Sequence, residues 1–211
     1  MRRILGNAVL LVSLAAIAGG ALYAQQPSAA KTPSAGTKNF TLNLGLTADG
    51  ERGQDSVSSA GIWMRGGAVD LTALRPKGYG AKVAASIGYA PHVASAVGVN
   101  TRMFVMGPVY DRTLDRFVPS KRPELKQLHL FGEGLVGAVE GFNGVYPAQG
   151  KSNSGADALA VEAGGGLNLD FKQRGGLRLL QVDYVHTALP NNGNNVQNNL
   201  RIGFGANIQL W

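Results

Sequence analysis

Apolar residues recur at every second position in four segments of the chain, with polar or small residues between them. Because successive side chains of a β-strand point to opposite faces, this period of two predicts strands with one apolar and one polar face. The four segments are 40–47, 81–90, 159–171 and 200–210.

Four more segments carry the same pattern less regularly, which brings the expected number of strands to eight. They are 62–73, 101–110, 128–139 and 177–188. Each predicted strand has about the 9–11 residues that a tilted strand needs to cross a bilayer. In 128–139 the alternation does not decide which face is polar, because Phe131 and Leu135 share the face of Glu133.

The alternation breaks inside 62–73. Ile62 and Met64 share one parity, whereas the apolar residues after them lie on the other. One extra residue would bring both sets to the same face, and glycine within a strand often marks such a bulge. We therefore predict a β-bulge at Gly66 and Gly67.

Charged residues lie in the middle of these segments, flanked by apolar residues. A soluble β-sandwich would expose such a polar face to water. An outer-membrane barrel would instead turn its apolar face to lipid and its polar face into a narrow interior, where opposite charges could pair across the lumen. The candidate interior charges are Arg65, Asp70, Lys82, Arg102, Glu133, Glu162 and Asp183.

The lengths of the connections favour the barrel. With the N-terminus in the periplasm, four long connections would face outward and three shorter turns inward, as is typical of outer-membrane barrels. The turn 111–126 departs from this pattern by its length. The outward loops are 48–61, 91–99, 143–157 and 189–198, and the inward turns are 74–79, 111–126 and 172–176.

Aromatic residues gather near the ends of the predicted strands. Membrane barrels carry girdles of aromatic side chains at both interfaces with water. The candidates for these girdles are Trp63, Tyr89, Tyr110, Phe142, Tyr146, Phe171, Tyr184 and Trp211.

The N-terminal residues indicate export. Arg2 and Arg3 precede the apolar segment 8–18, which is short for a membrane span and is followed by small residues. We predict a signal peptide at 1–24, cut after Ala24; an uncleaved anchor is the alternative. Residues 25–38 are rich in Pro, Ser, Ala, Thr and Lys and predict a disordered periplasmic linker before a barrel domain at 39–211.

Composition narrows the class of protein further. Only 16% of the 211 residues are charged, and cysteine is absent, which excludes disulfides and thiolate metal sites. Removal of the predicted signal peptide with Arg2 and Arg3 lowers the formal charge from +7 to 7 − 2 = +5, and this mild excess favours contact with anionic lipid or lipopolysaccharide. No basic stripe with interleaved aromatic residues indicates nucleic acid as a partner.

Several stretches resemble the family of small outer-membrane β-barrels related to the OmpA transmembrane domain and OmpX. The resemblance implies an all-β fold, an eight-stranded antiparallel up-and-down transmembrane β-barrel, with a mostly structural role. The stretches that carry it are 103–108, 130–138, 164–169, 179–184 and 197–203.

The C-terminal sequence Ile208-Gln209-Leu210-Trp211 is similar to the terminal signal of many such barrels, although Trp211 is one position out of phase. The similarity implies the outer-membrane barrel assembly machinery as a partner.

The sequence offers no set of residues for catalysis, a cofactor or a metal. His92, His129 and His186 have no partner at ligand spacing. Thr187 follows His186, but adjacent strand residues face opposite ways and cannot act together. Gly164-Gly165-Gly166 lacks the Lys-Ser/Thr of a phosphate loop. We therefore expect no enzyme, no cofactor and no bound metal.

The predicted protein is a monomeric integral outer-membrane barrel with both termini in the periplasm, a lumen filled by polar and charged side chains, and a structural or surface-interaction role. Three alternatives stay open: a narrow porin-like channel, a lipid-modifying barrel enzyme, and a soluble ligand binder of lipocalin type with an inward apolar face.

Overall fold

The computed structural model describes residues 40–53, 62–90, 99–114, 128–148, 151–171, 174–190 and 195–210. The predicted signal peptide, the predicted linker, His92 and Trp211 lie outside these ranges, as do most of the predicted outward loops 48–61 and 91–99 and most of the turn 111–126. No helix in the described part of the chain is long and apolar enough to span a membrane.

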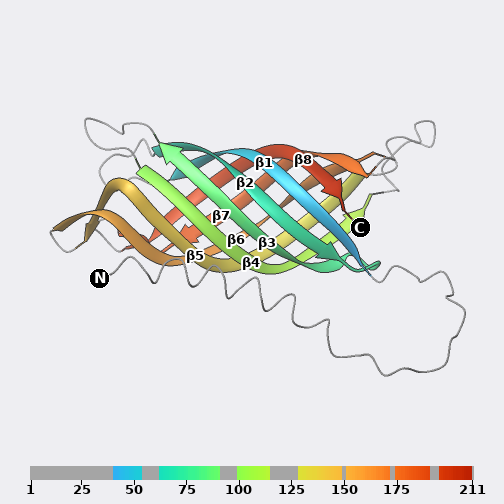
Figure 1. Cartoon of the computed structure of the whole chain (residues 1–211), viewed down its shortest axis with the longest axis horizontal. Helices are drawn as coiled ribbons and strands as arrows, with labels where there is room; N and C mark the ends of the chain where they lie inside the picture. The colour runs from blue at the N-terminus through green and yellow to red at the C-terminus, as the bar shows by residue number, and fades with distance from the viewer. Residues whose placement is uncertain are drawn as a thin grey trace, which may run out of the picture. The chain divides into compact units, whose positions relative to one another are not determined.

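Eight antiparallel strands close into a barrel in which each strand pairs with the next and β8 pairs with β1 (Figure 1). The predicted fold class is confirmed. The strands are β1 (Thr41–Gly53), β2 (Ile62–Leu74), β3 (Tyr79–Ala90), β4 (Val99–Thr113), β5 (Leu128–Ala148), β6 (Lys151–Asp170), β7 (Gly175–Thr187) and β8 (Gln197–Gln209).

The turn between β2 and β3 is tight. Gly78 has a φ of 87°, and its amide donates a hydrogen bond of 2.8 Å to the carbonyl of Arg75. A side chain at Gly78 would also meet the carbonyl oxygen of Asp111 on the neighbouring strand. Glycine is therefore required there both by the backbone conformation and by the close approach of β4.

The bulge predicted at Gly66 and Gly67 is wrong. β2 pairs with β1 and with β3 in unbroken register through both glycines. Met64 therefore faces the interior together with Asp70, and both are buried. The prediction failed because it required every apolar residue of β2 to face the same side.

A bulge does occur in β7. In the pairing of β7 with β8, the register shifts between Arg178 and Gln181 of β7. In the pairing of β6 with β7, it shifts between Leu167 and Asn168 of β6. Leu179 and Leu180 are consecutive and both are exposed, which is the mark of an extra residue on the outer face. Consequently, even-numbered residues face the lumen before the bulge, and odd-numbered residues face it after the bulge.

The segment 143–157 was predicted as an outward loop, but its described residues continue strands β5 and β6 as a β-hairpin. β5 and β6 remain paired as far as Ala148 and Lys151, with a register shift between Phe142 and Tyr146. In Figure 1 the two strands reach beyond the end of the other strands. The barrel thus carries a protruding two-stranded arm where the sequence predicted irregular chain.

Candidate functional site

The interior of the barrel is polar in its middle section, while the outer surface is apolar. Among the described residues, thirteen buried polar or charged side chains include acid–base clusters, whereas every strand exposes at least one large apolar side chain on its outer face. Burying charge costs free energy unless each charged group is paired. The interior charges are therefore the candidate functional site, and their pairing is described first.

Lys82 occupies the centre of one cluster. Its Nζ donates hydrogen bonds of 2.9 Å to both carboxylate oxygens of Glu133, and it lies 3.8 Å from Oδ2 of Asp70. Its ammonium also lies 5.9 Å from the centroid of the Phe131 ring. The lysine from β3 thus joins carboxylates of β2 and β5, two strands that are not neighbours in the sheet.

Arg178 extends this cluster to β7. Its Nη1 donates hydrogen bonds to Oδ2 of Asp70 at 2.7 Å, to Oγ1 of Thr47 at 2.9 Å and to Oε1 of Gln181 at 2.9 Å. Its guanidinium carbon lies 5.2 Å from the Phe131 ring centroid. Two cations therefore flank one aromatic ring, and both pair with Asp70.

A second cluster surrounds Arg201 on β8. Its guanidinium forms an ion pair with Glu162, and its Nε lies 3.4 Å from Oδ2 of Asp183. Gln181 connects the two clusters, because its amide nitrogen donates to Asp183 at 2.8 Å and to Glu133 at 3.2 Å. The polar side chains form one network that links strands on opposite sides of the lumen.

Most of the predicted interior charges lie in this network. Asp70, Lys82, Glu133, Glu162 and Asp183 are all buried and directed inward. The positions of Lys82 and Glu162 agree with the polar parity predicted for β3 and β6, and the burial of Glu133 shows which face of β5 is inward.

Arg65 and Arg102 were predicted to be interior charges, and both placements are wrong. Arg65 is exposed on the outer face of β2, because β2 has no bulge to turn it inward. Arg102 is also on the outer face, with 63% of its side chain exposed, and donates a 2.7 Å hydrogen bond to Glu140. The inward positions on either side of Arg102 are occupied by Thr101 and Met103, neither of which is charged.

Two interior arginines, Arg178 and Arg201, are not among the predicted interior charges. Arg178 has the opposite parity to Asp183 in strict alternation, and only the bulge at Leu179 and Leu180 brings both inside. Arg201 alternates with Leu200 and Ile202 and so lies on the polar face of its strand, but its position alone does not identify its partners. The one feature of the sequence that could have indicated an inward Arg178 is its position as a single arginine between two leucines.

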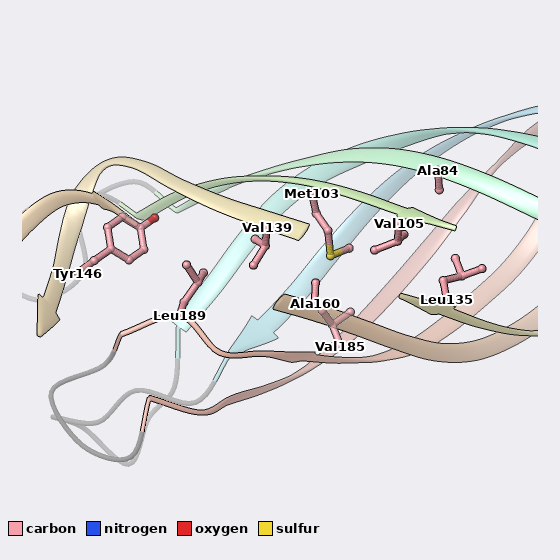
Figure 2. Packing of buried hydrophobic residues seen from close by; sticks show 9 residues of the cluster. All are labelled: Ala84, Met103, Val105, Leu135, Val139, Tyr146, Ala160, Val185 and Leu189. Atoms are coloured by element: carbon pink, nitrogen blue, oxygen red, sulfur yellow. The ribbon is translucent and has the colours of Figure 1, made fainter. Parts of the chain in front are cut away.

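An apolar cluster fills the lumen between the charged network and the end that carries the arm. Figure 2 shows these side chains arranged along the barrel from Tyr146 and Leu189 to Leu135 and Ala84. Its members are Ala84, Met103, Val105, Leu135, Val139, Tyr146, Ala160, Val185 and Leu189. The lumen is therefore not polar throughout, and the predicted uniform polar filling is incomplete.

Tyr146 closes this cluster at its outer end. It is 1% exposed, and its hydroxyl donates a 2.5 Å hydrogen bond to the carbonyl of Asn100. A side chain at Gly141 would lie 2.2 Å from the tyrosine ring, so glycine is required for the ring to lie there. Tyr146 was predicted for the aromatic girdle; instead the register shift in β5 turns it inward.

The spaces left between the interior side chains are small. The three that lie among the charged groups have volumes of about 10, 20 and 30 Å³. One water molecule needs about 10–15 Å³ measured in this way. Each of these three spaces is therefore of the size for one or two water molecules.

Glu133, Glu162 and Asp183 are the described acidic residues that come close enough together for a metal ion. Oxygens of these three carboxylates lie within 4.8 Å of one another. Lys82, Arg201 and Gln181 already bind them by ion pairs and hydrogen bonds. The pairing by cationic side chains accounts for the cluster without a metal.

His129 lies inside the barrel near the end where β1 begins. Its Nδ1 is 2.7 Å from Oδ1 of Asp111, and its Nε2 is 3.6 Å from Oδ2 of Asp170. Asn207 donates a 2.7 Å hydrogen bond to the second oxygen of Asp170. These contacts join β4, β5, β6 and β8, so this histidine has a structural setting that its sequence spacing did not predict.

His186 lies on the outer side of β7. Its Nδ1 is 2.8 Å from Oδ1 of Asn198, the same atom that accepts a hydrogen bond from the Tyr184 hydroxyl. Its neighbour Thr187 is buried in the interior, as the alternation of strand side chains requires. The two residues therefore cannot form a catalytic pair.

Exposed aromatic residues lie toward both ends of the outer surface. On β3, Tyr79 and Tyr89 are 62% and 54% exposed. Ten residues of strand span about 33 Å, or about 25 Å along the axis for a tilt near 40°. This matches the apolar band of about 25 Å between the aromatic girdles of membrane barrels. The exposed aromatic residues near the two ends are Phe40, Trp63, Tyr79, Tyr89, Tyr110, Phe171 and Tyr184.

Neisserial surface protein A has a similar structure, with a TM-score of 0.56 over 80% of this chain and 97% of that protein, at 9% sequence identity. The chain has the fold of the small outer-membrane β-barrels. The resemblance inferred from the sequence is thus confirmed for the fold.

Two further solved structures align over a similar share of the chain. They are Ail of Yersinia pestis (TM-score 0.45, 14% identity, 80% of this chain and 97% of Ail) and the N-terminal barrel domain of Pseudomonas aeruginosa OprF (0.41, 13%, 77% and 96%). No family profile and no curated protein matches the sequence.

Proposed function

We propose that this protein is an integral outer-membrane barrel that acts as a closed structural scaffold and presents the β5–β6 arm at the cell surface. The observation that carries the proposal is the inverted distribution of side chains. Paired charges lie inside, and leucine, isoleucine, valine and phenylalanine lie outside. In water such an exterior would aggregate, whereas in a bilayer it is solvated by lipid.

The same distribution argues against a soluble binding protein of lipocalin type. Such a protein would need an apolar lumen with room for a ligand and a polar exterior. Here Lys82, Arg178 and Arg201 occupy the lumen, and the three spaces described among the interior charges have volumes of about 10, 20 and 30 Å³. The lumen is also too full for a porin-like channel in this conformation.

The proposed orientation places both chain ends in the periplasm and the arm outside. β1 begins and β8 ends at the same end of the barrel, and the β5–β6 arm extends from the opposite end. The arm exposes polar residues such as Asn153, Ser154 and Asp157. It is the described element that extends furthest from the barrel wall, which makes it the best candidate for contact with a partner.

Cell fractionation and conductance measurements test this proposal together. We expect the protein in the outer-membrane fraction, and we expect no ion current above the lipid baseline when the purified barrel is added to a planar bilayer. A large-channel porin inserted by the same procedure is the control. Recovery in the soluble periplasm would contradict the membrane location, and steady single-channel steps would contradict the closed lumen.

A further inference from the structure

A groove runs along the outer surface of the barrel where β8, β1, β2 and β3 lie side by side. It is shallow and widely open, and it is lined almost entirely by apolar groups. In one row across these strands, Phe204, Ala48, Gly67 and Ile87 are direct neighbours. The two small residues form the floor, and the phenylalanine and isoleucine, which are 67% and 66% exposed, form the walls.

The groove continues toward the end that carries the arm. In the next row of outward positions, Gly50 lies between Ile202 and Arg65, and a Cβ atom at Gly50 would meet nothing within 4 Å. From Leu46 to Arg52 the floor strand rises about 20 Å, or about 15 Å in depth for a tilt near 40°. This is about the depth of hydrocarbon in one leaflet of a bilayer.

Two arginines lie at the upper end of the groove. Arg65 lines it directly, and Arg52 is diagonally opposite on β1, with its guanidinium 5.9 Å from the Trp63 ring centroid. Among the described residues that face outward on β8, β1, β2 and β3, Arg52 and Arg65 are the charged ones. No aspartate or glutamate occupies a described outward position on these four strands. Arg102 on β4, outside this groove, forms an ion pair with Glu140.

We propose that this groove binds one phosphorylated membrane lipid, with an acyl chain between Phe204 and Ile87 and a phosphate on Arg65 and Arg52. The apolar floor fits a hydrocarbon chain, and the two guanidinium groups complement a phosphate, which they bind through charge-assisted hydrogen bonds. The inference rests on the proposed function, because it places the arm end of the barrel in the outer leaflet.

Native mass spectrometry of the folded barrel in a neutral detergent tests the site, with diphosphoryl lipid A as the probe. We expect Arg65→Gln to weaken binding by about tenfold to a hundredfold, since a hydrogen bond to a charged group is lost. Ala48→Phe, which fills the floor, should weaken binding to a similar extent, and Ala48→Leu is a milder substitution if the first disturbs folding. Monophosphoryl lipid A should bind more weakly than the diphosphoryl form.

The matched controls change the same residue types elsewhere on the outer face. Arg102→Gln and Ala163→Phe should leave binding of lipid A unchanged. Equal binding by all variants, or an equal loss in the controls, would overturn the proposal. A change of oligomeric state with Ala48→Phe in sedimentation would also overturn it, because the groove would then bind a second copy of the chain. Each variant is first checked for membrane insertion, so failure of the proposed function is recognised separately.

Discussion

Lys82 is the residue at which the interior charges converge. It contacts Glu133 and Asp70, and each of the three side chains is almost completely buried. Attraction between buried charges offsets the free energy of removing them from water only while each has its partners. The stability of the barrel wall is therefore expected to depend on this single ammonium group.

Replacing Lys82 by Met should destabilise the folded barrel by about 3–5 kcal/mol, because Glu133 would stay buried without its cation and Asp70 would keep only Arg178. Urea unfolding in lipid vesicles, followed by tryptophan fluorescence, measures the change. Arg102→Met removes an exposed ion pair instead and should cost about 1 kcal/mol or less. A similar loss in the two variants would contradict the importance of the interior network.

Gly45 is a second residue on which the network depends. A Cβ atom there would lie 2.4 Å from Oδ2 of Asp70, so Gly45→Val should displace this carboxylate and destabilise the barrel by about 1–3 kcal/mol. Gly50→Val is the matched control on the same strand, since its Cβ meets nothing within 4 Å. Unfolding free energies of the two variants give the comparison. Equal values would show that the space beside Asp70 is not needed.

Among the strands, β7 shows most clearly how an element places its side chains. Without the extra residue at Leu179 and Leu180, Arg178 and Asp183 could not both point into the lumen. The bulge thus supplies the arginine that pairs with Asp70 and connects β7 to β2. The bulge therefore has a structural role, because it directs the arginine side chain into the lumen.

Deletion of Leu179 should restore strict alternation in β7 and remove Arg178 from the network. We expect a loss of stability of about 3–5 kcal/mol, since Asp70 would lose a buried partner. Leu179→Ala, which keeps the bulge and changes only an exposed side chain, should have a small effect. If the deletion variant unfolds at the same urea concentration as the wild type, the bulge does not position Arg178.

Strand periodicity predicted the elements well where one face is apolar and the other polar. The regular parities of β1, β3, β6 and β8 placed Lys82 and Glu162 correctly. Strand periodicity gave the wrong inward face where the residues that line the lumen are themselves apolar. Met64 and Met103 face inward, so Arg65 and Arg102 face outward, and alternation alone cannot distinguish an inner apolar face from an outer one. The apolar cluster is a tertiary feature that appears only when four or more strands come together.

The whole molecule combines a lipid-facing exterior with a filled interior. Exposed leucine, isoleucine and valine side chains lie between the aromatic residues of the two ends, and the lumen is occupied by the charged network and the apolar cluster. Closure of β8 on β1 leaves no free strand edge in the wall. A barrel of this construction resists separation of its strands, because every backbone hydrogen bond of the wall is made within the protein.

Gel mobility in SDS with and without heating tests this account most directly. We predict that the unheated protein runs as a compact folded barrel and that boiling shifts it to the mobility of the unfolded chain. The Lys82→Met variant should make this shift at a lower temperature. Identical mobility of the heated and unheated wild-type protein would contradict a closed barrel with a paired interior.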